Sequence, residues 1–214
     1  MPLPFDPPVL VTFIGSMNWT VGFLTTVAIF GILALALNLQ WGYSGVFNFG
    51  IVAFFMAGAY TSALLTIDAP SEFENYIGGY ELPVFVGWIG GAVAGGLLAL
   101  IVGLPTLRLR RDFLAITTIG IAAILRSTAN SVEGFVNRGR GLNGIPRFLD
   151  GIVDGSDYRW LMLAVTVAML ALVYFVLSRV TASPWGRVLR AIRENEDTVK
   201  ATGKDTVSFR MQSF

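Results

Sequence analysis

Five long apolar segments restrict this chain to folds that are built in a lipid bilayer. A helix needs about 20 apolar residues to cross the hydrocarbon layer. The segments that approach or reach this length are Trp19 to Gln40, Val46 to Ile67, Pro83 to Leu107, Phe113 to Val132 and Trp160 to Val180. Only 14% of the residues are charged, whereas soluble domains carry roughly 25%. The sequence therefore predicts an all-α integral membrane protein, a polytopic helix bundle with about five spans.

The distribution of basic residues predicts which loops face the cytoplasm. The link that contains Arg108, Arg110 and Arg111 is basic, and so is the tail from Ser183 to Phe214. The link from Asp68 to Leu82 contains acids and no base. By the positive-inside rule, the basic link and the tail are cytoplasmic and the acidic link is outside. With five spans this alternation is consistent, and it places the N-terminus outside.

Several classes of chemistry are excluded by what the sequence lacks. Cysteine and histidine are absent, which removes disulfides, thiolate chemistry, histidine acid–base catalysis and the common zinc sites. No acidic residue lies in the middle of a predicted span, which argues against a proton- or sodium-coupled carrier. No phosphate-binding GxxxxGK[ST] motif is present, and the net charge of +1 gives no nucleic-acid signal. We therefore predict a protein that is not an enzyme and holds no cofactor or metal, and any energy for transport must come from another chain.

The segment after the last span has the pattern of an amphipathic helix. Ser183 suits the N-cap, Pro184 the first helical position and Gly203 the helix end. Its apolar residues recur at helical spacing and are Trp185, Val188, Leu189, Ile192 and Val199. We therefore divide the chain into an N-terminal segment (1–18), a transmembrane bundle (19–182) and a cytoplasmic segment (183–214).

Small and polar residues within the spans indicate packing surfaces and a candidate pathway. Gly87, Gly91 and Gly95 recur every four residues, which favours close packing inside the bundle over contact with another subunit. The pathway candidates are Asn38, Asn48, Tyr60, Thr117, Thr118 and Arg126. Hydrogen bonding between helices is the alternative for the uncharged residues, and snorkelling to the interface is the alternative for Arg126. The link from Trp41 to Gly45 is either a turn or a break inside the membrane.

Five motifs follow one another along the chain. They are ALALNLQWGYSG (34–45), FGIVAFFMAGAY (49–60), LRLR with DFLAI (107–116), GLNGIP (141–146) and GRVLRAIRENE (186–196). In this order they resemble the branched-chain amino acid ABC transporter permease family, LivM/LivH type, and LivM more closely. Members of that family often have a histidine near Ile51 and a glutamate at the position of Ala123, and this chain has neither. They also continue through further spans, so we expect the C-terminal part of the permease domain to be missing after Phe214.

The resemblance implies a transmembrane subunit of a prokaryotic ABC importer for branched-chain amino acids, located in the plasma (inner) membrane. Its implied partners are a second permease subunit, ABC ATPase subunits that hydrolyse the ATP, an extracytoplasmic substrate-binding protein and the surrounding lipid. The cytoplasmic segment then becomes a coupling helix whose apolar face docks in a groove of the ATPase. Its expected coupling residues are Arg187, Arg190, Arg193, Glu194, Asp197, Thr198, Val199 and Gly203.

Three alternatives remain at this stage. Urea or short-chain amides are rival substrates within the same family. A membrane anchor that recruits a soluble partner through the cytoplasmic helix would need no transport pathway. The same helix could also lie on anionic lipid through its arginines, although its interspersed acids make this less favourable than docking.

Overall fold

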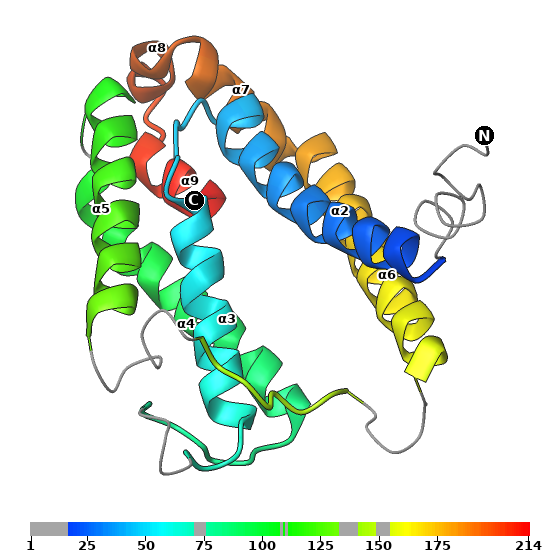
Figure 1. The fold of residues 1–214 in the computed structure, drawn as a ribbon. Coiled ribbons are helices and arrows are strands. Elements are labelled where there is room, and N and C mark those ends of the chain that lie inside the picture. The colour runs from blue at the N-terminus through cyan, green and yellow to red at the C-terminus, as the bar shows by residue number, and fades with distance from the viewer. Residues whose placement is uncertain (1–16, 71–75, 108, 110, 133–140, 149–154) are drawn as a thin grey trace, which may run out of the picture. The chain divides into compact units, whose positions relative to one another are not determined.

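The computed structural model describes residues 17–70, 76–107, 109, 111–132, 141–148 and 155–214. The elements in these ranges are all helical (Figure 1). In chain order they are α2 (Met17–Leu37), the π-helical turn η1 (Asn38–Tyr43), α3 (Ile51–Thr66), α4 (Val84–Thr106), α5 (Arg111–Ser131), α6 (Gly155–Ala182), α7 (Pro184–Glu194), α8 (Glu196–Ala201) and α9 (Thr206–Ser213). The chain divides into two compact units, Met1–Leu35 with Leu149–Arg179 and Ala36–Phe148 with Val180–Phe214. Most of the predicted N-terminal segment, together with Arg108 and Arg110, lies outside the described residues.

Four helical stretches are long and apolar enough to cross a membrane. They are Trp19–Tyr43, Val84–Thr106, Phe113–Ser131 and Asp157–Ala182. Helix α3 is also apolar but has 16 residues, or about 24 Å at 1.5 Å per residue, against a hydrocarbon layer of about 30 Å. The predicted polytopic helical fold is confirmed. Each of the five predicted spans corresponds to a helix, but the second begins at Ile51 instead of Val46 and is too short to qualify by length.

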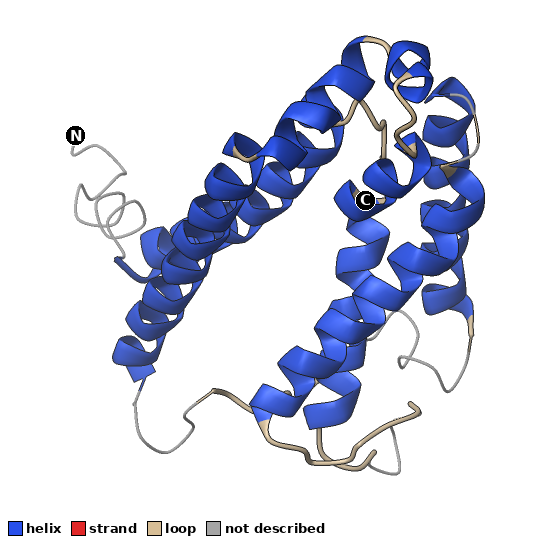
Figure 2. Ribbon diagram, turned by 180° about the vertical axis from the view of Figure 1, so that it is seen from behind, coloured by secondary structure: helices blue, strands red, loops and turns tan. Residues whose placement is uncertain are grey.

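The first unit consists mainly of α2 and α6, which lie side by side in both views (Figures 1 and 2). Gly31 is the point of close approach, because a Cβ atom added there would lie 3.3 Å from Leu170 Cδ1. Large apolar side chains on both helices remain exposed, among them Phe30, Leu172 and Phe175. Such extensive apolar exposure is the mark of a surface that meets lipid or another protein.

In the second unit, α3 and α4 pack closely enough for their backbones to touch. A Cβ atom added to Gly91 would lie 2.6 Å from the Gly58 carbonyl oxygen, and one added to Gly58 would lie 2.9 Å from the Gly91 carbonyl oxygen. Gly87 lies against Thr66 and Ser62 in the same way, and Gly95 lies against the Phe54 carbonyl. The glycine face of α4 is therefore its contact surface with α3, as small residues allow in helix pairs within lipid.

The segment between η1 and α3 is a non-helical strap that crosses to α5. Asn48 is buried, and its side-chain Oδ1 accepts a hydrogen bond from the Gly50 N–H at 2.9 Å. The Phe49 N–H donates to Thr118 Oγ1 on α5 at 3.2 Å. These bonds satisfy backbone donors just before α3, which explains why the helix begins at Ile51. The predicted link from Trp41 to Gly45 is mostly helical, because η1 continues α2 through Tyr43 before the chain turns.

Candidate functional site

Helices α7, α8 and α9 lie at one end of the second unit, where α3 and α5 begin and α4 ends (Figure 1). The single helix predicted from Ser183 to Gly203 is in fact two helices, because Asn195 is extended (φ −152°, ψ 101°) and its side chain caps α8 by accepting from the Thr198 N–H. Pro184 does occupy the first turn of α7. Ser183 is the N-cap residue, but its hydroxyl donates to the Val180 carbonyl and forms no capping bond.

The apolar face of this segment is buried within the chain. Leu189 and Ile192 are 0% and 1% exposed, and Val199 is buried as well. Helix α7 contacts η1, α8 and α9. These three residues are therefore covered by the chain itself, because amphipathic spacing shows that a face is buried without showing what covers it. Trp185 and Val188 of the same predicted face are half-buried, and docking of this segment on an ATPase stays a prediction.

Two arginines of α7 reach the turn that follows α2. The Arg193 guanidinium donates to the Gly42 carbonyl oxygen and also pairs with Glu194 at 3.0 Å. The Arg190 guanidinium carbon lies 6.0 Å from the centroid of the Tyr43 ring, at the limit for a cation–π contact. Gly45 has φ +68°, and an added Cβ atom would lie 2.9 Å from Arg193 Cγ, so glycine suits this position for both its backbone angle and its close contact. This contact joins α7 to η1.

The other expected coupling residues are mostly exposed. Arg187, Glu194, Asp197 and Thr198 are exposed on α7 and α8. Gly203 is exposed too and has φ +79° just after the end of α8. The surface that this segment offers to another molecule is consequently polar and charged.

A charged cluster between α8 and α9 was not predicted from the sequence. Glu196 accepts from Thr206 Oγ1 (3.1 Å), pairs with Lys200 (3.0 Å) and pairs with Arg210 (3.3 Å). The Arg210 side chain is only 5% exposed. Burial raises the pKa of Glu196, but the hydrogen bond from Lys200, the charge of Arg210 and the bond from Thr206 together bring it below the usual value of 4.5. The sequence did contain a signal for the start of α9, the helix that carries Arg210. Asp205 is an N-cap residue type, and it caps α9 by accepting from the N–H groups of Val207 and Ser208.

Helix α9 inserts its end into the bundle. Gln40 Nε2 donates to the Phe214 carbonyl oxygen at 2.6 Å, and the Phe214 ring meets the Phe54 ring edge-on at 5.5 Å. Met211 and Phe214 pack on a core of buried residues, namely Val46, Leu107 and Leu114. Sequence reasoning missed this role, because nothing in the short polar pattern of α9 identifies a partner about 170 residues earlier.

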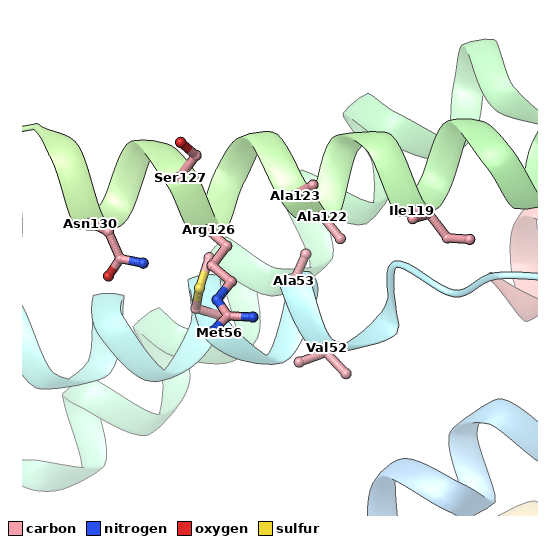
Figure 3. Close-up of a pocket in the computed structure, with 9 residues that line it drawn as sticks. All are labelled: Val52, Ala53, Met56, Ile119, Ala122, Ala123, Arg126, Ser127 and Asn130. Carbon is pink, nitrogen blue, oxygen red and sulfur yellow. The ribbon is translucent and has the colours of Figure 1, made fainter. Parts of the chain in front are cut away.

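A cavity of about 530 Å³ lies between α3 and α5 (Figure 3). It is open at the surface of the unit, since Arg126, Asn130, Val52 and Ile119 are all exposed. Its polar lining residues are all on α5 and are Arg126, Ser127 and Asn130. Its apolar lining residues come from both helices and are Val52, Ala53, Met56, Ile119, Ala122 and Ala123. Figure 3 shows Arg126 and Asn130 extending from α5 toward α3, with Met56 beside Arg126.

Of the predicted pathway candidates, Arg126 alone is among the residues that line this cavity. Asn48 and Thr118 are buried together at the strap before α3. The Thr117 hydroxyl donates to the Phe113 carbonyl of its own helix at 2.7 Å. Tyr60 is half-buried on α3, and Asn38 is exposed on η1. The structure therefore does not bring the candidates together into one site.

These features define a multi-pass helical membrane protein with a helical assembly at one end of its bundle. The chain belongs to the family described as "Branched-chain amino acid transport system / permease component", whose model matches residues 19–214. The resemblance seen in the sequence motifs is thus confirmed, and the curated relatives found are of the LivM type.

Two relatives illustrate the similarity. A probable branched-chain amino acid transport permease protein LivM from Methanocaldococcus jannaschii is 31% identical over an alignment of 209 positions. This alignment covers 86% of this chain and 59% of that protein. The high-affinity branched-chain amino acid transport system permease protein LivM of Escherichia coli is 29% identical over an alignment of 218 positions. This alignment covers 91% of this chain and 48% of that protein. The chain thus spans about half the length of these relatives. No solved structure matches it significantly.

Proposed function

We propose that this chain is a transmembrane permease subunit of a prokaryotic ABC importer that translocates branched-chain amino acids. ATP is hydrolysed by a separate ATPase subunit bound to the cytoplasmic segment 183–214, below the transmembrane bundle 19–182. A second permease subunit and an extracytoplasmic substrate-binding protein complete the assembly in the plasma (inner) membrane. Family membership and the names of the LivM relatives support this function.

The observation that carries the coupling proposal is the attachment of α7 to the turn after α2. Arg193 binds the Gly42 carbonyl, and Gly45 leaves room for the Arg193 side chain. The opposite, polar face of α7 and α8 is exposed and presents Arg187 and Asp197. A movement imposed on this polar face by an ATPase would pass through α7 to η1, which directly continues the helix of the first span.

We expect the ATPase to bind the polar face of α7 and α8 and not the apolar face that the sequence suggested. Because Leu189, Ile192 and Val199 are used inside the chain, the ATPase contact is polar and charge-complementary. Such contacts contribute specificity and association rate more than raw affinity. The buried face in turn makes α7 and α8 a firm part of the bundle end, which is what a force-transmitting element requires.

The test combines co-purification with transport. The tagged chain is purified from its native cells in mild detergent, and the recovered complex is reconstituted for uptake of labelled leucine. We expect a Walker-motif ATPase to co-purify. In Arg193→Gln the ATPase should still be recovered, but leucine uptake per ATP hydrolysed should fall about tenfold, since a hydrogen bond to a charged group contributes roughly 1.5–3 kcal/mol.

Lys204→Gln is the matched control, because Lys204 is exposed between α8 and α9 and also loses a single positive charge. It should leave uptake unchanged. Failure of any ATPase to co-purify with the wild-type chain would contradict the proposed function. Equal uptake by Arg193→Gln and wild type would contradict the coupling route.

A further inference from the structure

Arg126 is an exposed charged residue within an apolar helix. It lies within the stretch Phe113–Ser131, which is long and apolar enough to cross a membrane. Among the described residues it forms no hydrogen bond and no ion pair. An ionisable side chain within a membrane span is costly, and such residues mark pathways or binding sites unless they reach the interface. A guanidinium in this position therefore calls for an anionic partner or for water.

The direction of the side chain favours a role in the cavity over snorkelling. Arg126 extends from α5 toward α3 and lies beside Met56 (Figure 3). It lies five residues before Ser131, the last residue of α5, so the interface is about 7.5 Å further along the helix axis. A snorkelling side chain would follow the axis toward the helix end, whereas this one crosses to the neighbouring helix.

The lining of the cavity combines an apolar wall with a few polar groups. Val52, Ala53 and Ile119 are among the residues that give it an apolar wall, while Arg126 and Asn130 place a cation and an amide on α5. Its volume of about 530 Å³ lies within the roughly 300–1,000 Å³ that is usual for small-molecule sites, which are mostly apolar with a few placed polar groups. A ligand that fits this lining is small, aliphatic along most of its surface and anionic at one end.

We propose that this cavity is a binding site for a branched-chain amino acid on its path through the protein. The Arg126 guanidinium binds the carboxylate, for which its planar fork of donors is suited. The Asn130 side-chain oxygen lies one helical turn away and accepts from the ammonium group. The aliphatic side chain packs against the wall of Val52, Ala53 and Ile119. The inference rests on the proposed transport function and names the residues that select the substrate.

The absence of cysteine from the chain makes a direct binding test available. A single cysteine is introduced in the cavity wall as Ala123→Cys in the otherwise unchanged chain. Its rate of modification by a charged methanethiosulfonate is then measured in detergent as L-leucine is added. Leucinol, which keeps the aliphatic and ammonium groups but lacks the carboxylate, is the comparison ligand. Ala201→Cys, at an exposed position of α8, is the matched control for effects remote from the cavity.

We expect leucine to slow modification of Ala123→Cys and to leave Ala201→Cys unaffected, with leucinol at least about tenfold less effective. Arg126→Gln in the Ala123→Cys background should raise the half-protecting leucine concentration at least about tenfold and remove the preference over leucinol. Arg126→Lys, which keeps the charge, should restore part of that preference.

Equal rates for Ala123→Cys with and without leucine would overturn the site. Equal protection by leucine and leucinol with wild-type Arg126 would also overturn it, and this comparison needs no Arg126 variant to fold. Because the assay requires no ATPase, its result is independent of the co-purification test. The site can therefore fail while the permease function stands, or hold while the coupling scheme fails.

Discussion

Among single residues, the glycines of α4 show how one residue type serves different local needs. Gly91 faces the α3 backbone so closely that an added Cβ atom would lie 2.6 Å from the Gly58 carbonyl oxygen. An added Cβ atom at Gly96 would meet nothing within 4 Å. The regular spacing of Gly87, Gly91 and Gly95 was visible in the sequence. Their partner Gly58 was not, because spacing within one helix carries no information about which helix lies opposite.

This difference predicts opposite effects for two identical substitutions. Gly91→Ala should destabilise the protein by about 1–3 kcal/mol, because the methyl group forces α3 and α4 apart. Gly96→Ala should be neutral or stabilise slightly, because alanine is favoured over glycine by about 0.5–1 kcal/mol within a helix. Thermal unfolding in detergent, followed by circular dichroism, measures both. Equal loss of stability in the two variants would show that α4 does not use its glycine face for this contact.

At the level of helices, the segment 183–214 shows what its sequence pattern could predict and what it could not. Spacing predicted a helix after the last span, and α7 follows Ser183 as expected. The break at Asn195 was missed, although an asparagine followed by Glu196 and Asp197 is a typical start of a new helix. The long-range pair of Glu196 and Arg210 could not be found by local spacing, because the chain turns between α8 and α9 to form it.

The pair of α8 and α9 predicts a pH-dependent stability. The pKa of Glu196 lies below its usual value of 4.5 in the folded protein, so its carboxylate stabilises the fold above that pH and loses this contribution as the pH falls through the folded pKa. At neutral pH, Glu196→Gln should therefore destabilise by about 1–3 kcal/mol, since the buried Arg210 loses a charged partner. The difference from wild type should shrink below pH 4.5.

Glu194→Gln is the control for this prediction, because the Glu194 side chain is 73% exposed beside Arg193. Exposed pairs of this kind contribute little, so its effect should stay within about 0.5 kcal/mol. Thermal unfolding of wild type and both variants across the pH range provides the comparison. A Glu196→Gln deficit that stays constant into acid would assign its effect to packing and not to charge.

For the whole molecule, composition and segment length were sufficient to predict a helical membrane protein, because few other folds tolerate such long apolar stretches. The helix ends followed within about five residues. Helix α3 begins five residues later than predicted, where Asn48 binds a backbone group, and α6 begins at Gly155, five residues before the predicted Trp160. The cavity between α3 and α5 could not be predicted from the sequence, although Arg126 was identified there as a charge within a span. A cavity depends on which helix faces pair, and that is a property of the assembled fold.

The assembled fold of the second unit also determines which of its loops lie on the same side of the membrane. Leu109, in the link between α4 and α5, lies at the end of the bundle that holds α7 to α9, whereas Asp68 follows α3 at the opposite end (Figure 1). The proposed function places the basic tail in the cytoplasm, as the positive-inside rule predicts, so an impermeant maleimide on intact cells should label Asp68→Cys. It should label Leu109→Cys and Lys204→Cys only after permeabilisation, and the cysteine-free parent serves as the blank.

Labelling of both Leu109→Cys and Lys204→Cys from outside would contradict the coupling scheme, since no ATPase could reach α7 and α8. Labelling of these two from opposite sides would contradict the helix arrangement itself.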